Sequence, residues 1–170
     1  STIKKEGTPQ VLSGKTVALL FEKPSLRTRV SFEVGVKQMG GTCIFLAGSE
    51  VGLGTREPES DVAKVLDRLV DVIIARVYSH SSLERLSENT DLPIINALSD
   101  QAHPCQAIGD CLTIYENKGR LKGLKICFVG DGNNIAGSLA LACSLAGMDF
   151  TIASPEKYKL PPEIWDSATD

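Results

Sequence analysis

The sequence has few of the residues and motifs that bind metals or cofactors. It contains two histidines and five cysteines, but no CxxC pair and no Cys/His spacing typical of a zinc site. It also lacks a GxxxxGK[ST] phosphate loop and a complete GxGxxG dinucleotide fingerprint. We therefore expect neither a metal nor a cofactor.

Long hydrophobic runs and an excess of basic residues are absent too. The longest apolar stretch, residues 135–147, is too short to span a bilayer and is interrupted by Gly and Ser. With 18 basic and 21 acidic residues, the formal charge is −3, and no basic stripe indicates nucleic-acid binding. The opening residues, STIKKEGTPQ, do not have the pattern of a signal peptide. These features predict a cytoplasmic protein, or a mitochondrial matrix protein in a eukaryote, that binds neither membrane nor nucleic acid.

The remaining composition is ordinary for a globular protein, with 42% hydrophobic and 23% charged residues. The odd number of cysteines, mostly within apolar stretches, predicts small buried side chains in a reducing compartment rather than disulfides. These cysteines are Cys43, Cys105, Cys111, Cys127 and Cys143.

Strand-like and helix-like segments alternate along the chain. Short apolar runs predict strands at residues 16–21, 42–46, 72–77, 93–96, 124–129 and 150–153. Periodic runs with start and stop signals predict helices at residues 25–39, 61–69, 82–89, 104–117 and 135–146. In the second of these helices we expect one apolar face, formed by Val62, Val65, Leu66 and Leu69. The alternation predicts an α/β fold, a parallel sheet with helices on both faces.

A polar, glycine-bearing stretch at residues 116–123, ENKGRLKG, predicts a domain boundary. Residues 1–118 would form the first domain. Residues 119–170 contain a single βαβ unit, which is too small to make its own core. We therefore expect a first α/β domain followed by the opening βαβ unit of a second, Rossmann-like domain.

A cluster of hydrogen-bond donors, PSLRTR, lies where the first predicted strand gives way to a helix. The N–H groups of a first helical turn carry partial positive charge and favour an anion. The hydroxyls of Ser25 and Thr28 and the guanidinium of Arg27 would complete a phosphate cradle. The alternative is that Ser25 only caps the helix and the arginines are solvated.

Two further sites carry polar groups at the ends of predicted elements. In HPCQ, His103 precedes Pro104 and should project from a loop, with Gln106 in the first helical turn. An imidazole and a carboxamide side by side can polarise a carbonyl oxygen and bind an NH2 group, although His103 could also pack on a helix end. Arg76 ends an apolar strand, where an unpartnered charge is costly to bury, so we expect it to point into a ligand crevice.

The motifs FEKPSLRTR, ARVY, HPCQ and GDGNN, in this order, resemble those of the aspartate/ornithine carbamoyltransferase family. FEKPSLRTR, REPESDVAKVL, HPCQA and DGNN together are most similar to its ornithine branch. The resemblance extends along nearly the whole chain and weakens after about residue 155. It implies transfer of a carbamoyl group from carbamoyl phosphate to the δ-amine of L-ornithine, by a homotrimer whose first domain binds carbamoyl phosphate and whose second binds ornithine.

The resemblance also implies a role for each motif residue. Phosphate would be held by Ser25, Leu26 (through its backbone), Arg27 and Thr28. Arg76 would bridge the phosphate and the carbonyl oxygen, which His103 would also contact. Gln106 would bind the carbamoyl NH2 group and Asn134 the ornithine. Arg27, Arg76 and His103 are thus the catalytic candidates.

The chain departs from the family in two respects. Leu26 replaces a common Thr, and Gly52 stands where many members carry a Gln or His that reaches a neighbouring subunit. The usual preceding helix and the later Asp…SMG and HCLP motifs are not found, so we expect a fragment that lacks much of the site for the amino-acid substrate.

Three alternatives stay open on the sequence. The acceptor could be aspartate, acetylornithine or putrescine. The chain could bind anions without catalysis. GDGNN after a strand could also indicate a dinucleotide site, but the next strand does not end in the expected acidic residue.

Overall fold

The computed structural model describes residues 7–169. Residues 1–6, which belong to the opening segment discussed above, and residue 170 lie outside the described residues. The chain divides into two compact units, residues 1–99 (the first unit) and residues 100–170 (the second unit). Among residues 7–169, no helix has both the length and the apolar character needed to cross a membrane.

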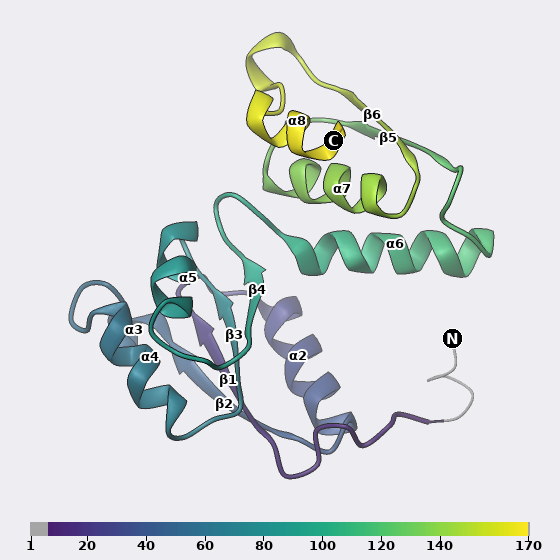
Figure 1. The fold of residues 1–170 in the computed structure, drawn as a ribbon. Helices are drawn as coiled ribbons and strands as arrows, with labels where there is room; N and C mark the ends of the chain where they lie inside the picture. The colour runs from purple at the N-terminus through teal and green to yellow at the C-terminus, as the bar shows by residue number, and fades with distance from the viewer. Residues whose placement is uncertain (1–6, 170) are drawn as a thin grey trace. The chain divides into compact units, whose positions relative to one another are not determined.

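The first unit is built on a four-stranded parallel sheet (Figure 1). Its strands are β1 (Thr16–Phe21), β2 (Thr42–Ala47), β3 (Val72–Arg76) and β4 (Ile94–Leu98). Their order is β2-β1-β3-β4, so β1 and β3 are central and largely buried. Because the strands are parallel, all four end at one edge of the sheet, where ligands bind in open α/β sheets.

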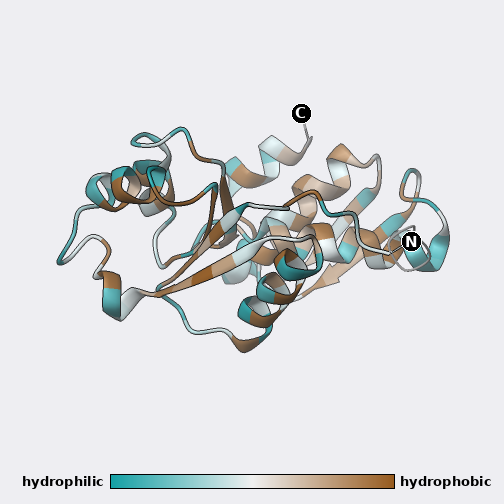
Figure 2. Ribbon diagram, turned by 90° about the horizontal axis from the view of Figure 1, so that it is seen from below, coloured by the Kyte–Doolittle hydropathy of each residue, from teal (hydrophilic) through white to brown (hydrophobic). Residues whose placement is uncertain are grey.

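Helices cover both faces of this sheet, which confirms the predicted fold class. One core lies beneath α2 (Leu26–Gln38), which buries Val36 against β1 and β3. The other lies beneath α4 (Glu59–Asp67) and α5 (His80–Ser87). Figure 2 shows the strands mostly in the hydrophobic colour and the helices in both colours, as expected for helices with one solvated side.

Three local predictions in the first unit are wrong. The loop expected after β2 contains a one-turn helix, α3 (Gly48–Val51). Helix α5 begins at His80 rather than at residue 82. Helix α4 begins at Glu59, and its predicted apolar face is only half buried, since Val65 is 55% and Leu69 67% exposed. The buried face of α4 also includes the carboxylate of Glu59. This charge can be buried because Arg85 of α5 pairs with it.

The second unit contains α6 (Pro104–Lys118) and a two-stranded parallel sheet of β5 (Lys125–Val129) and β6 (Asp149–Ala153). Helix α7 (Asn134–Leu145) connects these strands, and the chain continues through η1 (Glu156–Tyr158) to α8 (Pro162–Thr169).

The βαβ unit gains its cores from the helices on either side of it. Cys111 and Ile114 of α6 pack with Leu139 and Cys143 of α7. Elsewhere α7 packs with Ile164 of α8. Helix α6, placed by the sequence at the end of the first domain, therefore packs within the second unit, and the boundary expected at residues 118/119 stays a prediction.

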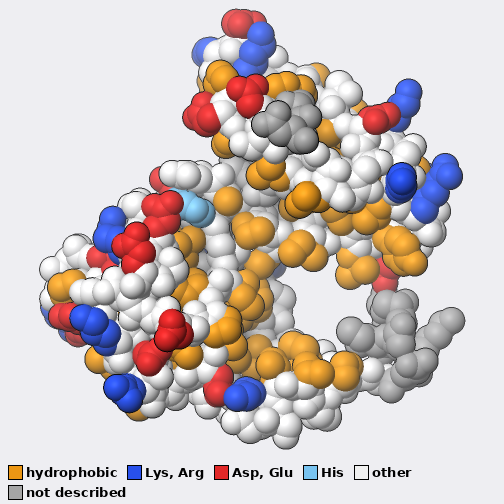
Figure 3. Space-filling view, viewed as in Figure 1, with side chains coloured by type: hydrophobic (Ala, Val, Ile, Leu, Met, Phe, Trp, Pro, Cys, Tyr) orange, Lys and Arg blue, Asp and Glu red, His pale blue; other side chains and the backbone are white. Residues whose placement is uncertain are grey.

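The five cysteines are not all buried, although most of them lie within apolar stretches of the sequence. Cys143 is fully buried, and burial, with a smaller effect of the neighbouring Cys111, raises its pKa to about 11. The prediction is wrong for Cys127, which is exposed because alternate residues of β5 face away from the core. Hydrophobic side chains also reach the surface on both units (Figure 3), among them Leu26, Val30, Ile108 and Leu112.

Candidate functional site

The donor cluster forms the turn between β1 and α2. Ser25 is extended, with φ −158° and ψ 109°, and takes the N-cap position of α2. Its Oγ donates to Thr28 Oγ1 at 2.9 Å and accepts a longer bond of 3.4 Å from the Thr28 N–H. The cap bond is weak by its length. The two hydroxyls thus meet at the start of the helix, and their role in holding a phosphate stays a prediction.

The charges around this turn favour an anion. No acidic residue lies in the first turn of α2, so the partial positive charge of its N–H groups is not offset there. Arg27 is exposed, and Leu26 is 79% exposed. Arg29 is engaged elsewhere, since its Nε donates to Glu33 at 2.8 Å and its guanidinium lies 3.6 Å from the centre of the Phe45 ring. Arg27 is therefore the arginine of this turn that is available for a ligand.

Arg76 ends β3 at the same sheet edge. The β3–β4 register shifts between Ala75 and Arg76, an irregularity of the kind that re-aims side chains near functional sites. Arg76 Nε is buried and has no hydrogen-bond partner among the described residues. Burial lowers the pKa of this guanidinium. A partly desolvated cation without a bond at Nε is a good candidate for an anionic ligand.

His103 and Gln106 lie in the second unit, at the start of α6. His103 occupies the N-cap position, and its backbone N–H donates to Ser138 Oγ of α7 at 2.8 Å. Its imidazole is half-buried. Gln106 is exposed, and its Nε2 donates to Asp110 Oδ1 at 2.9 Å, which leaves Oε1 to accept from an NH2 group. That His103 and Gln106 lie near Arg27 and Arg76 stays a prediction.

The GDGNN loop leads from β5 into α7, and its two asparagines differ in role. Asn133 caps the helix, because its Oδ1 accepts from the N–H groups of Ile135 and Ala136 at 3.0 and 3.3 Å. Asn134, the candidate ornithine contact, is the first residue of α7 and is half-buried. Its contact with a substrate stays a prediction.

Gly52 ends α3 in a left-handed conformation with φ 65°. A Cβ there would lie 2.7 Å from Cβ of Arg56, so a Gln or His would require the loop to move. The loop conformation thus favours glycine at this position.

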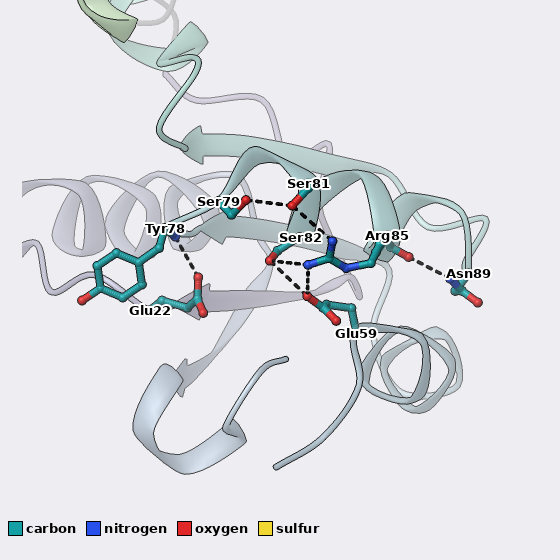
Figure 4. A network of polar contacts seen from close by, with 8 residues as sticks. All are labelled: Glu22, Glu59, Tyr78, Ser79, Ser81, Ser82, Arg85 and Asn89. Atoms are coloured by element: carbon teal, nitrogen blue, oxygen red, sulfur yellow. Dashed lines mark hydrogen bonds and ion pairs between the residues drawn. The ribbon is translucent and has the colours of Figure 1, made fainter. Parts of the chain in front are cut away.

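A buried polar network joins the start of α4 to α5, and the sequence does not predict it. Glu59 is 7% exposed and accepts bonds from Arg85 Nη2 at 2.6 Å and Ser82 Oγ at 3.0 Å (Figure 4). The hydrogen bond from Arg85 is the main reason that the pKa of Glu59 is lowered. Among residues 7–169, no group of three or more His, Cys, Asp or Glu side chains could hold a metal ion.

Comparison with family models covers most of the chain. Residues 1–116 match the carbamoyl-P binding domain of aspartate/ornithine carbamoyltransferases. Residues 122–170 match the Asp/Orn binding domain of the same proteins.

The curated relatives include several ornithine carbamoyltransferases. That of Bacillus subtilis is 46% identical over 166 residues, covering 98% of this chain and 52% of the relative. That of Methanocaldococcus jannaschii is 50% identical over 150 residues, covering 88% of this chain and 49% of the relative. The chain thus spans about half the length of the curated relatives it matches.

Solved structures show the same fold. Ornithine carbamoyltransferase from Pyrococcus furiosus aligns with a TM-score of 0.94 and 45% identity, over 98% of this chain and 53% of the other. An N-acetyl-L-ornithine transcarbamylase aligns with a TM-score of 0.88 and 29% identity, over 98% of this chain and 59% of the other. By its fold, its motifs and the two family models, the chain belongs to the aspartate/ornithine carbamoyltransferase family.

Proposed function

We propose that the protein transfers the carbamoyl group of carbamoyl phosphate to the δ-amine of L-ornithine, giving citrulline and phosphate. The observation that carries the proposal is the turn at Ser25–Thr28, where paired hydroxyls, a helix N-terminus and Arg27 favour an anion. The similarity to ornithine carbamoyltransferases supports carbamoyl phosphate as that anion and ornithine as the acceptor.

The proposed roles divide between binding and polarisation. Ser25, Arg27, Thr28 and the backbone of Leu26 hold the phosphate, and Arg76 bridges it to the carbonyl oxygen. In the second unit, His103 donates to the carbonyl oxygen, Gln106 accepts from the carbamoyl NH2 group, and Asn134 contacts ornithine. Each role is a proposal that rests on the resemblance and on the chemistry of the side chain.

The chemistry needs no covalent nucleophile. The neutral δ-amine attacks the carbonyl carbon, and the carbonyl oxygen gains negative charge. The C=O bond then re-forms as the bond from carbon to the bridging phosphate oxygen breaks. Phosphate leaves with the electron pair of that bond and takes up the proton that the amine nitrogen loses. Because phosphate is already a good leaving group, orientation of the amine and stabilisation of the oxyanion should supply most of the rate enhancement.

The cradle is tested by binding. Inorganic phosphate and carbamoyl phosphate should raise the midpoint of thermal unfolding, by an amount equivalent to about 2.7 kcal/mol at a ligand concentration one hundred times the Kd. Arg27→Ala should abolish the shift. Lys37→Ala, which removes a cation from the last turn of the same helix, is the matched control and should leave the shift unchanged. No shift with the unsubstituted protein would refute the cradle.

The acceptor and the assembly require separate measurements. Citrulline formation from ornithine, compared with aspartate, acetylornithine and putrescine, identifies the amine. Phosphate binding without any carbamoyl transfer would support an anion-binding module instead. We further propose that the protein assembles as a homotrimer, as the resemblance implies, and light scattering that shows a monomer at micromolar concentration would refute this.

A further inference from the structure

Glu22 lies where three loops of the first unit come together. It directly follows β1, and its backbone N–H donates to the Arg76 carbonyl oxygen at 2.9 Å. Its carboxylate Oε2 accepts the Tyr78 N–H at 2.8 Å (Figure 4). Glu22 therefore continues the pairing of β1 with β3 beyond the end of the sheet. Its backbone N–H bonds to Arg76, and its carboxylate bonds to Tyr78.

The loop after β2 packs against the same residue. A Cβ placed on Gly48 would lie 2.7 Å from Cα of Glu22 and 3.2 Å from the Phe21 carbonyl oxygen. Only glycine permits this approach without a backbone shift. The close contact holds the start of α3 against the backbone of Glu22.

A second contact joins the loops that follow β1 and β3. Lys23 Nζ lies 4.9 Å from the centre of the Tyr78 ring, within the range of a cation–π interaction. Residues 22–23 and 76–78 are thus tied by two hydrogen bonds and one ring contact. Ser25 follows only three residues after Glu22, so this tie limits where the cradle can lie relative to Arg76.

The charge of Glu22 excludes a direct role in holding phosphate, since a carboxylate repels an anion. We infer that Glu22 is a positioning residue, which accepts the Tyr78 N–H in order to hold the cradle turn in register with Arg76. The inference rests on the proposed function, because it takes phosphate as the ligand of the cradle. Its physical basis is preorganisation: a site held in place before binding loses less conformational entropy when the ligand arrives.

The test separates the hydrogen bond of Glu22 from its charge. Glu22→Gln removes the charge but keeps an oxygen that can accept the Tyr78 N–H, whereas Glu22→Ala removes both. Glu33→Gln is the matched control, since it removes a carboxylate on α2 that pairs with Arg29 instead. Phosphate affinity is measured by titration calorimetry, and exchange of the Tyr78 amide hydrogen is followed by NMR.

The two substitutions should differ in their effect on phosphate affinity: Glu22→Ala should weaken binding and Glu22→Gln should not. Glu22→Ala should raise the Kd for inorganic phosphate about fivefold, in the range expected for one lost hydrogen bond, and should speed exchange of the Tyr78 amide. Glu22→Gln should bind phosphate at least as tightly as the unsubstituted protein, because a repulsive charge is gone and the bond remains. Glu33→Gln should leave the Kd within about twofold, as expected for an exposed ion pair.

Other outcomes overturn the inference in distinguishable ways. If Glu22→Ala and Glu22→Gln both tighten binding, the carboxylate acts only through its charge. If Glu22→Gln weakens binding as much as Glu22→Ala, the Tyr78 bond is not what matters. If the alanine variant fails to fold, Glu22→Gln decides alone, because weaker phosphate binding than in the unsubstituted protein would by itself contradict the inference. If the unsubstituted protein binds no phosphate while the Tyr78 amide is protected, the proposed function fails, and the positioning role fails with it.

Discussion

Replacing Glu59 should destabilise the first unit by an amount set by its two hydrogen bonds. The Glu59 side chain is 9% exposed, while that of Arg85 is 49% exposed. A charge-assisted bond contributes about 1.5–3 kcal/mol when buried, and the solvation of Arg85 reduces this to about 1 kcal/mol. The Ser82 bond adds about 1 kcal/mol. We therefore expect Glu59→Ala to lower the free energy of unfolding by about 2 kcal/mol, and Glu59→Gln, which keeps an acceptor oxygen, by about 1 kcal/mol.

The same contact makes stability depend on pH with a defined sign. Folding lowers the pKa of Glu59, so the unfolded chain binds more protons in the acid range. The stabilisation is complete above the ordinary carboxyl pKa of about 4.3 and is lost as the pH falls through the lower, folded value. Glu59→Gln should lose less stability on acidification than the unsubstituted protein, because a carboxamide does not titrate in this range.

The assay is urea unfolding followed by far-UV circular dichroism at a series of pH values. Glu33→Gln is the control, because it removes an exposed carboxylate paired with Arg29 at i,i+4 and should change stability by no more than about 0.5 kcal/mol. A Glu59→Ala variant as stable as the unsubstituted protein would refute the reasoning. So would a Glu59→Gln variant that retains the full acid dependence.

Three further predictions concern the site and the thiols. Ser25→Ala should raise the Kd for phosphate about tenfold by calorimetry, through loss of a hydroxyl at the cradle, and a change below about twofold would remove Ser25 from the site. His103→Ala should lower kcat for citrulline formation by about 10²–10³ with little change in phosphate affinity, and near-normal kcat with reduced stability would indicate a structural histidine. An aromatic disulfide reagent at about pH 8 should modify Cys127 rapidly and Cys143 only on unfolding, because Cys127 is exposed and Cys143 is buried with its pKa raised to about 11. Rapid labelling that persists in Cys127→Ser would contradict the assignment.

The sequence by itself determined the elements whose signals are local. Strand β1 matches its prediction because a run of apolar residues leaves few alternatives to a buried strand. Helix α2 lies within one residue of its predicted bounds at each end, since Ser25 at its start and the glycine pair after Met39 are capping signals read within a few positions. The contact between Ser25 and Thr28 was predictable for the same reason, because the two residues are three positions apart and their contact requires only that the helix forms.

Tertiary structure decided the features whose partners are distant in sequence. Glu59 lies before the helix that the sequence predicts at residues 61–69, and its burial in the structure depends on Arg85, 26 positions away, which supplies the compensating charge. Glu22 has no role that the sequence indicates, and its contact with the Tyr78 N–H, 56 positions away, exists only because the parallel pairing of β1 with β3 brings the two together. Helix α6 follows the same rule, since its apolar residues are evident from the sequence but their packing against α7 is not. Local propensity determines that an element forms and where it lies to within about two residues, whereas the burial of a charge or the choice of a packing partner depends on free energies that exist only once the chain has folded.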